Sequence, residues 1–491
     1  MTPNLGISMS DYQGAGADGL LEGSSSADQL DNLNKALTAG TITGRETTGL
    51  TNVGSQSLKL ESLDANLKTL TFKEGQLELY KWVPKMAAYN TVEEYNQLLS
   101  YGADGGGFIS ETELPAVADS VYTRGMELIK FMGVQGEVSL AAQMVKNNVG
   151  NLYQTEIRNK MIYLLHKVNR ALAFADSEVA TKEFNGIYAQ HQRQFGSLDI
   201  EAASDSVLDL RGAVLTQAHF ETASQGIINN FGFGDTIFLD PKTKADFGIT
   251  HFANQRFPMT NGQGGFAGTV GTVPSEVNTS GGSVKMIQDV FLDTSRAART
   301  LASAQIGTGP ATPSAPTVTT PATTGSLFGA GDAGNYIYAV AAVGPNGESA
   351  LLDLGGGAVI AVAAGDGTDI TFTDGDATTT GYKIYRSEKG ATFGTAVPLY
   401  PIISISKAAK VAGYDGGAAN HIIDKNRTIA GTRKAFMIQN DMDVWTIKQL
   451  APMFKLDLPR LAQSDRFMVL AYLNLTCFAL RKITVIKNIA R

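Results

Sequence analysis

Histidine and cysteine carry much of the acid–base, nucleophilic and metal chemistry of proteins, and this chain has few of either. Its one cysteine, Cys477, lies in the apolar run 468–480, which predicts a small buried side chain and excludes an intrachain disulfide. The five histidines form neither an HExxH motif nor a pair at metal-ligand spacing. They are His166, His191, His219, His251 and His421. We therefore predict no catalytic residue, no metal site and no cofactor.

Motifs that bind phosphate or activate a nucleophile do not occur in the sequence either. The glycine-rich stretches 102–107 and 262–271 lack the Lys-Ser/Thr ending of a phosphate-binding loop and are predicted to be flexible loops. No G-x-S-x-G sequence is present. Four basic residues of one predicted helix could face phosphates, but a solvated helix face explains them better. They are Arg158, Lys160, Lys167 and Arg170.

Pairs of neighbouring acidic residues are the remaining candidates for catalysis. They are Glu93/Glu94, Glu111/Glu113 and Asp441/Asp443. Two carboxylates about 5–10 Å apart can hydrolyse a glycosidic bond, so a secreted or surface glycan-acting enzyme is one alternative for this chain. Solvated or ion-paired acids are much commoner. We therefore predict that the chain is not an enzyme.

The composition indicates a large protein that does not read nucleic-acid sequence. A chain of 491 residues is too long for one compact core, so two or three domains are expected. The 53 glycines suit turns and long loops. A net charge of −7 argues against a protein whose main role is to bind nucleic acid tightly. No run approaches the roughly 18 apolar residues that span a bilayer, and residues 1–11 lack the features of a secretory signal. We expect no membrane partner.

The first half of the chain contains segments of different composition and periodicity, which predict different structural elements. Residues 1–60 are rich in Gly, Ser, Thr and Asp, which predicts an arm that is disordered or docks on a partner. Thr91 and Glu94 form a capping-box pattern that predicts a short helix. Alternation within 108–145 predicts an extended hairpin, and 147–175 has the pattern of one long amphipathic helix. The core face of that helix is predicted to be Ile157, Met161, Leu164, Leu165, Val168 and Leu172.

The second half predicts an α/β region interrupted by a β module. Thr216 is placed to cap a helix with the apolar face Phe220, Ala223, Ile227, Ile228 and Phe231. A predicted strand, 235–239, leads into Asp240-Pro241, which favours the start of another helix. The Pro-rich stretch 308–325 predicts a linker, and short strands at the spacing of a β-sandwich follow it. Apolar strand patterns resume in 426–491, so the β module is predicted to be an insertion.

Several long segments resemble the major capsid proteins of tailed bacteriophages. They read LESLDANLKTLTF, YKWVPKMAAYNTVEEYNQLLSYGADGGGFISETELP, DSVYTRGMELIKFMGV, YQTEIRNKMIYLLHKVNRALAFADS and DTIFLDPKTKADF. The resemblance covers about 56–300 and 430–491. It implies an α+β fold of the Hong Kong 97 type, with an N-terminal arm, an extended loop, a peripheral domain that holds a spine helix, and an axial domain. Within the insertion, GYKIYRSEKG resembles a strand of an immunoglobulin-like or fibronectin-type domain.

The resemblance divides the chain into seven parts. They are an arm (1–60), the first part of the peripheral domain (61–107), the extended loop (108–145), the peripheral domain with the spine helix (146–215), the first part of the axial domain (216–307), the immunoglobulin-like insertion with its linkers (308–425) and the return strands of both parent domains (426–491). Contacts between subunits are expected at the loop residues Phe108, Ile109, Glu111, Glu113, Arg124 and Lys130.

The function implied by the resemblance is structural. Copies of the chain would assemble into hexamers and pentamers of an icosahedral head that encloses double-stranded DNA, with the insertion displayed outside. The implied partners are further copies of the chain, a scaffolding protein, a portal, decoration or minor capsid proteins, and packaged DNA bound without sequence specificity. The protein is expected in the virion after assembly in the bacterial cytoplasm. A tail-tube or baseplate protein is a second alternative, which a long helix beside an extended hairpin fits poorly.

Overall fold

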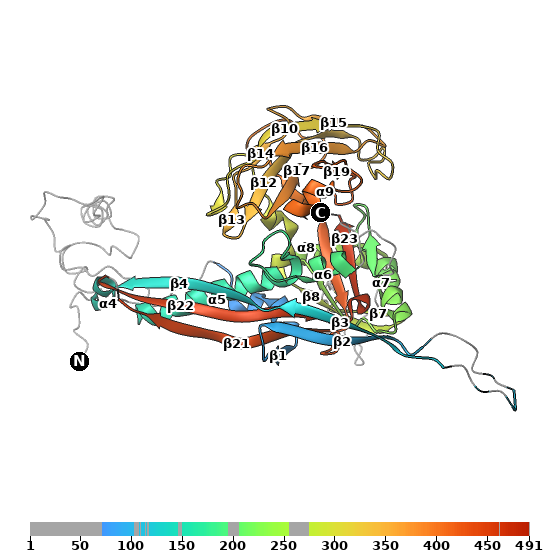
Figure 1. Ribbon diagram of the computed structural model, residues 1–491, viewed down its shortest axis with the longest axis horizontal. Coiled ribbons are helices and arrows are strands. Elements are labelled where there is room, and N and C mark those ends of the chain that lie inside the picture. The colour runs from blue at the N-terminus through green and yellow to red at the C-terminus, as the bar shows by residue number, and fades with distance from the viewer. Residues whose placement is uncertain are drawn as a thin grey trace, which may run out of the picture. The chain divides into compact units, whose positions relative to one another are not determined.

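The computed structural model describes residues 71–102, 108, 110–112, 114, 117–145, 150–194, 206–254, 274–460 and 462–490. The predicted arm 1–60 lies outside these residues, as do two predicted contact residues, Ile109 and Glu113. Apart from Gly150, the described residues belong to one compact unit. Helices and strands alternate irregularly along this unit, and strands from distant parts of the sequence pair, as the predicted α+β class requires (Figure 1).

A long four-stranded sheet forms one layer of the parent fold. In spatial order its strands are β1 (Lys85–Ala87), β21 (Trp445–Leu458), β22 (Ser464–Cys477) and β4 (Lys130–Ser139). Strand β22 pairs antiparallel with both β21 and β4, so segments far apart in the sequence lie side by side (Figure 1). Val469, Leu473 and Leu475 alternate along β22 and are buried in the main core, because every second residue of a strand faces the same side.

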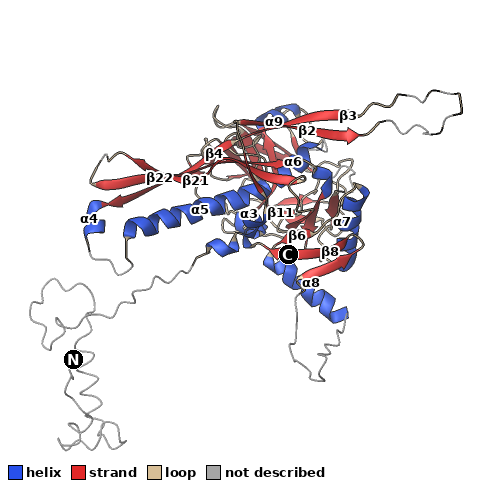
Figure 2. Cartoon of the chain, turned by 90° about the horizontal axis from the view of Figure 1, so that it is seen from below, coloured by secondary structure: helices blue, strands red, loops and turns tan. Residues whose placement is uncertain are grey.

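The predicted spine helix is present as α5 (Leu152–Phe174), which lies along this sheet (Figure 2). The Asn151 side chain accepts hydrogen bonds from backbone N–H groups of the first turn, which is the reason the helix begins there. Five of the six predicted core-face residues contact the main core, namely Ile157, Met161, Leu164, Val168 and Leu172. The sixth, Leu165, is half-buried and lies outside that cluster.

A second sheet has six strands. In spatial order they are β5 (Val207–Asp209), β23 (Ile483–Ile489), β20 (Arg433–Ile438), β6 (Thr236–Leu239), β8 (Gly282–Gln288) and β7 (Glu276–Thr279). Helices α7 (Gln217–Asn229) and α8 (Pro241–Asn254) contribute Phe220 and Phe247 to a core that also holds Met437 of β20. The next residues on either side, Phe436 and Ile438, belong instead to the main core. The sheet is therefore buried on both faces.

The helix starts predicted in this region agree with the structure, whereas one predicted core residue does not. Thr216 is the N-cap of α7, and Asp240 accepts a hydrogen bond from the backbone of Thr243 in the first turn of α8. The prediction that Phe231 lies on the buried face of α7 is wrong. The helix ends at Asn229, and Phe231 follows with a positive φ and an exposed side chain.

Short helices and a buried polar junction connect the parent layers. The short helices are η2 (Glu74–Gln76), α3 (Glu78–Trp82), α4 (Leu140–Met144), α6 (Ile187–Gln194), η3 (Val290–Leu292), η4 (Thr294–Ala297) and η5 (Leu480–Lys482). Asp289 follows β8 and is fully buried. Its carboxylate accepts from Asn169 Nδ2 of α5 at 2.7 Å, from the backbone N–H of Leu79 of α3 at 3.0 Å and from that of Phe291 of η3 at 2.8 Å. One carboxylate thus fixes three helices.

Strands β2 (Val92–Ser100) and β3 (Val121–Leu128) form a hairpin that pairs with no other described strand (Figure 2). The prediction of a helix from Thr91 is therefore wrong, because pairing along β2 outweighs a local capping-box signal. The predicted bounds of the extended loop, 108–145, also need correction. The hairpin begins at Val92, and residues 130–139 are β4 of the long sheet rather than part of the loop.

The inserted segment folds into sheets of its own. Its elements are β9 (Ile306–Gly307), β10 (Ser314–Thr319), β11 (Gly334–Tyr336), β12 (Tyr338–Gly344), β13 (Gly347–Glu348), β14 (Leu352–Asp353), β15 (Ile360–Val362), β16 (Thr368–Thr373), β17 (Gly381–Arg386), β18 (Tyr400–Ser406), α9 (Lys407–Ala412) and β19 (Ile422–Asp424). Strands β18-β17-β12-β13-β9 form the largest sheet, and β10-β16-β19 form another. Two hydrophobic clusters lie wholly within residues 298–430, which we call the inserted module.

The inserted module begins before the predicted boundary at 308. Arg299 already bridges to Leu399, and β9 pairs with β13. The predicted linker 308–325 contains β10, an edge strand, where a proline costs no hydrogen bond of the sheet. Thr294 Oγ1 donates to the backbone carbonyl of Thr432 at 2.7 Å, so the chain leaves and rejoins the parent at nearly the same place. Close ends of this kind are typical of an insertion.

Candidate assembly surfaces

The β2–β3 hairpin exposes large apolar side chains along its length. Tyr101 is 86% exposed and Leu114 is 91% exposed, while Tyr122 and Met126 on β3 are each 70% exposed. Soluble monomers rarely leave so many large apolar groups together in solvent, and such patches mark interaction sites. A two-stranded hairpin alone is also only marginally stable in water. This surface therefore lacks a covering layer within the described chain.

The base of the hairpin, in contrast, is fixed to the long sheet. The Gln97 side chain donates to the carbonyl of Phe478, and the ring of Phe478 lies edge-on to Tyr95 with 5.1 Å between centroids. Glu93 forms an ion pair with Lys448 of β21 at 3.0 Å. Burial raises the pKa of Tyr95 to about 12, so its hydroxyl stays neutral near pH 7. The subunit itself therefore sets the direction in which the hairpin leaves the sheet.

The predicted contact residues do not all belong to the hairpin. Phe108 and Glu111 are exposed and lie between β2 and β3. Arg124 lies on β3 in a solvent-exposed ion pair with Glu94 of β2, at 3.2 Å. Lys130 lies on β4, and its ammonium group donates to a backbone carbonyl of the segment that follows α5. Lys130 thus contributes to the parent fold rather than to the exposed hairpin.

The two acidic pairs that the structure fully describes, Glu93/Glu94 and Asp441/Asp443, make local structural contacts. Glu93 pairs with Lys448 and its neighbour Glu94 pairs with Arg124, because successive residues of a strand face opposite sides. The Asp441 carboxylate accepts from the backbone of residue 443 within a turn. Among the residues that the structure describes, no group of three or more His, Cys, Asp or Glu could hold a metal ion. In the described pairs Glu93/Glu94 and Asp441/Asp443, the carboxylates do not face each other across a substrate groove, and Glu113 lies outside the described residues.

The buried histidine and cysteine are poorly suited to chemistry. Burial lowers the pKa of His191 to about 3, so its imidazole is neutral at physiological pH. The ring of His166 packs against Phe72 and Phe291, and burial lowers its pKa as well. Burial raises the pKa of the Cys477 thiol, which keeps it protonated and unreactive. No helix in the described part of the chain is long and apolar enough to cross a membrane.

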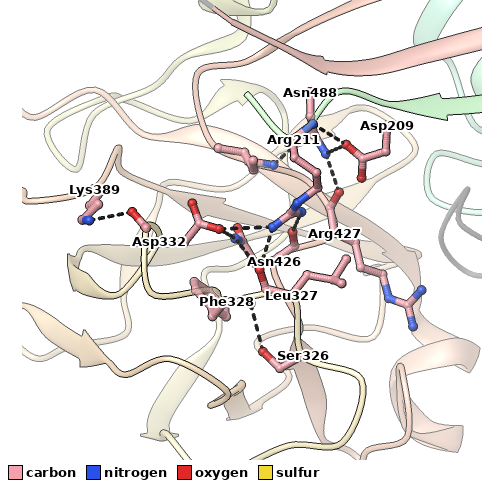
Figure 3. A network of polar contacts seen from close by, with 12 residues as sticks. Asp209, Arg211, Ser326, Leu327, Phe328, Asp332, Lys389, Asn426, Arg427 and Asn488 are labelled. Atoms are coloured by element: carbon pink, nitrogen blue, oxygen red, sulfur yellow. Dashed lines mark hydrogen bonds and ion pairs between the residues drawn. The ribbon is translucent and has the colours of Figure 1, made fainter. Parts of the chain in front are cut away.

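A polar network joins the inserted module to the edge of the six-stranded sheet (Figure 3). Arg211, which follows β5, donates through its guanidinium to the carbonyl of Asn426 at 2.7 Å and to that of Leu327 at 2.6 Å. The same guanidinium pairs with Asp332 at 3.2 Å, and the Asn426 amide donates to that carboxylate at 3.1 Å. We call this set the Arg211 contact. In this contact a single parent side chain donates hydrogen bonds to two part-buried backbone carbonyls of the module and pairs with one of its carboxylates.

The backbone at the Arg211 contact adopts a rare conformation. Arg211, Asn426 and Asn488 have φ values of 49°, 59° and 55°. Non-glycine residues adopt this left-handed region at a cost of roughly 1 kcal/mol or more, so neighbouring contacts must hold them there. Asp209 supplies such contacts, because its Oδ1 accepts from the backbone of Arg211 at 2.9 Å and from Asn488 Nδ2 at 2.7 Å. No sequence pattern predicted this network, although asparagine tolerates the left-handed region and was a weak signal at Asn426 and Asn488.

The chain is similar in sequence to capsid proteins of phages. Residues 130–307 match the sequence profile of the family described as SU10 major capsid protein. Over 457 residues the chain is 24% identical to the major capsid protein of Staphylococcus phage S25-3, which covers 91% of this chain and 93% of that protein. The capsid of a native GTA particle is 9% identical with a TM-score of 0.44 and covers 91% of this chain and 100% of its own. The capsid of cyanophage P-SCSP1u is 9% identical with a TM-score of 0.42, covering 91% and 99%.

The chain is therefore a structural protein of a virus shell. The sequence matches identify it further as a phage major capsid protein, whose place is the capsid of the virion, and confirm the predicted resemblance. The observed α+β fold has the long helix, the extended hairpin and the two sheets that a Hong Kong 97-type capsid protein is expected to contain.

Proposed function

We propose that the β2–β3 hairpin is the element with which one capsid subunit binds the next. The observation that supports this most directly is the set of exposed apolar side chains on the hairpin. Tyr101 and Tyr122 lie beyond the anchored base, and Met126 lies opposite Glu94 within it. Burying one such side chain against a neighbour contributes about 1.5–3 kcal/mol. Association would therefore bury the apolar side chains of the hairpin against a neighbouring subunit, because its own subunit leaves them exposed.

Through such contacts the subunits form hexamers and pentamers of an icosahedral head that encloses double-stranded DNA. The net charge of −7 suits a container that surrounds DNA without binding its sequence. Assembly takes place in the bacterial cytoplasm with scaffolding and portal proteins, and decoration or minor capsid proteins bind the finished shell. The chain has no catalytic role in this proposal.

The inserted module is, in this proposal, an immunoglobulin-like domain displayed on the outer surface. Its two hydrophobic clusters are its own, and the chain enters and leaves it beside Thr294 and Thr432. A module attached in this way adds to a shell without interrupting the parent core. The parent division into peripheral and axial parts follows the long sheet with α5 and the six-stranded sheet, respectively.

Replacing residues 101–120 by Asn-Gly tests the role of the hairpin. A two-residue turn of this type closes a hairpin between Ser100 and Val121, which are cross-strand partners. The anchored base and the long sheet stay intact, so the subunit is expected to fold. A deletion that extended to residue 140 would remove β4 and could not separate assembly from folding. Electron microscopy and sedimentation should show folded subunits and no closed shells, and normal shells would refute the proposal.

A double substitution, Tyr122→Ser with Met126→Ser, tests the apolar contacts themselves. Loss of about 3 kcal/mol or more per subunit contact raises the concentration needed for assembly by at least about a hundredfold. Val411→Ser is the matched control, because Val411 is also exposed but lies on α9 of the inserted module. The control should assemble like the parent chain. Equal assembly of the double variant and the control would contradict the proposed contact.

A further inference from the structure

We propose that the inserted module is a brace between two parts of the parent fold, and not only a displayed domain. At one end it binds the edge of the six-stranded sheet through the Arg211 contact. At the other end it binds the segment that follows α5, residues 175–186, which packs on the main core. The inference concerns the subunit itself and does not depend on the geometry of the shell.

The second point of attachment is a close approach of two backbones. Thr380 Oγ1 of the module donates to the carbonyl of Val179 at 2.6 Å, and Lys182 donates to the side chain of Asn346 at 2.6 Å. A Cβ atom added at Gly381 would lie 2.9 Å from Val179 Cα, so only glycine permits this distance. Val179 is itself buried. We call this set the Val179 contact.

The parent side of the Val179 contact is part of the main core and not a loose loop. Phe184 and Ile187 belong to the cluster that contains α5 and the long sheet. The backbone N–H of Gly186 donates to the carbonyl of Ala175 at 2.8 Å, which closes the segment on itself. A load applied by the module at Val179 therefore reaches the layer formed by α5 and the long sheet.

One strand of the module runs from one contact to the other. Strand β17 begins at Gly381, beside Val179, and ends at Arg386, about 17 Å away at the usual rise of a strand. It is a central strand that pairs with β12 on one side and β18 on the other, so it cannot bend freely. The Arg386 guanidinium donates to Asn426 Oδ1 at 2.6 Å, and the carbonyl of Asn426 accepts from Arg211.

Arg386 is held rigidly at the end of this strand. Its side chain is almost fully buried, donates to Asp424 at 2.6 Å and lies 5.2 Å and 5.1 Å from the ring centroids of Phe328 and Tyr336. A buried guanidinium with a carboxylate partner and aromatic neighbours has little freedom to move. The path from Val179 through β17 and Asn426 to Arg211 is thus continuous and stiff.

Hydrogen exchange of the full-length Arg211→Ala variant tests the brace. Exchange should rise about tenfold at the Arg211 contact, in residues 326–333 and 424–428, because a charged hydrogen-bond donor is lost. The prediction specific to a brace is a rise of about threefold at residues 176–183, across the module. Lys389→Ala is the matched control: Lys389 donates to Gly331 of the same module loop but touches no parent residue in the network (Figure 3). The control should leave residues 176–183 unchanged.

The reciprocal variant is Thr380→Val, which removes the hydroxyl donor at Val179 while keeping the size of the side chain. It should raise exchange at residues 209–212 and 488–490, beside Arg211. Arg211→Lys keeps the charge and loses the forked geometry, so it should give an intermediate effect and serves if the alanine variant fails to fold. Changes confined to the contact that was altered, in both directions, would overturn the brace and leave two independent contacts.

Discussion

Substituting Asp289 by Ala should destabilise the parent fold more than any single surface change. The buried carboxylate accepts three hydrogen bonds, from Asn169 Nδ2 at 2.7 Å, from the Leu79 backbone at 3.0 Å and from the Phe291 backbone at 2.8 Å. Each donor left unsatisfied in the interior costs about 1–3 kcal/mol. Partial relaxation reduces the sum, so we expect a loss of about 3–5 kcal/mol in the free energy of unfolding.

Tryptophan fluorescence during urea unfolding measures this loss in the parent fold alone. The chain has two tryptophans, Trp82 and Trp445, and both lie outside the inserted module. Asp289→Asn keeps one acceptor oxygen and should lose less stability than the alanine variant. Asp376→Ala is the control, because its carboxylate caps an exposed turn, and its unfolding midpoint should not move. A loss below about 1 kcal/mol for Asp289→Ala would refute the junction as a determinant of stability.

Two further predictions concern packing and pH. Gly136→Ala should lower the free energy of unfolding by about 1–3 kcal/mol, because a Cβ there would overlap the ring of Phe467 on the paired strand. Gly75→Ala is the control, because Gly75 has open space around it. Equal melting temperatures of the two variants would contradict the clash. His191 has a folded-state pKa of about 3 against about 6.5 when unfolded, so the unfolded chain binds a proton that the folded chain does not. Its stabilising contribution is complete above about pH 6.5 and falls by roughly 1.4 kcal/mol per pH unit below that. Between pH 7.5 and 4.5 the melting temperature should therefore fall more steeply with pH for the parent chain than for His191→Met. An equal fall for both would contradict this assignment.

Local signals predicted the three long helices of the parent fold, α5, α7 and α8, but not its short helices. Helix α5 combines a capping Asn151 with an apolar stripe over many turns, and Asp240-Pro241 marks the start of α8 as expected. Both signals act within a few residues and need no knowledge of distant segments. The fold class followed from long stretches of family resemblance rather than from any single pattern.

Long-range pairing explains the errors. A capping-box pattern at Thr91 predicted a helix, but pairing with β3 makes the segment a strand. Residues 130–139 alternate like a hairpin, yet their partner is β22, more than 300 residues further along the chain. The prolines of 308–325 predicted a linker, but the segment contains an edge strand, β10, which accommodates Pro316. In each case the deciding partner is remote, so a local pattern could not select it.

The junction between module and parent was invisible in the sequence for a related reason. The network around Arg211 draws single residues from separate segments, among them Asp332, Asn426 and Asn488, and no sequence motif joins them. The exposed hairpin was easier to anticipate, because its apolar residues are close in sequence. An exposed surface made by one segment can be predicted from the local sequence. A contact between distant segments of the same chain can be predicted only when the three-dimensional fold is known.

The hairpin and the inserted module are placed in opposite ways: we propose that a neighbouring subunit covers the hairpin, whereas the module is covered within its own subunit. The hairpin is oriented by Glu93 and Tyr95 at its base but left uncovered at its tip, so its direction is set before a partner arrives. A segment already oriented loses less conformational entropy on docking, which favours association. The module, in contrast, buries its own clusters and is bonded to the parent at Arg211 and Val179, so its position does not wait for a neighbour. Substitutions at the hairpin tip should therefore change assembly while leaving subunit stability unchanged, and substitutions at the module contacts should change the subunit first.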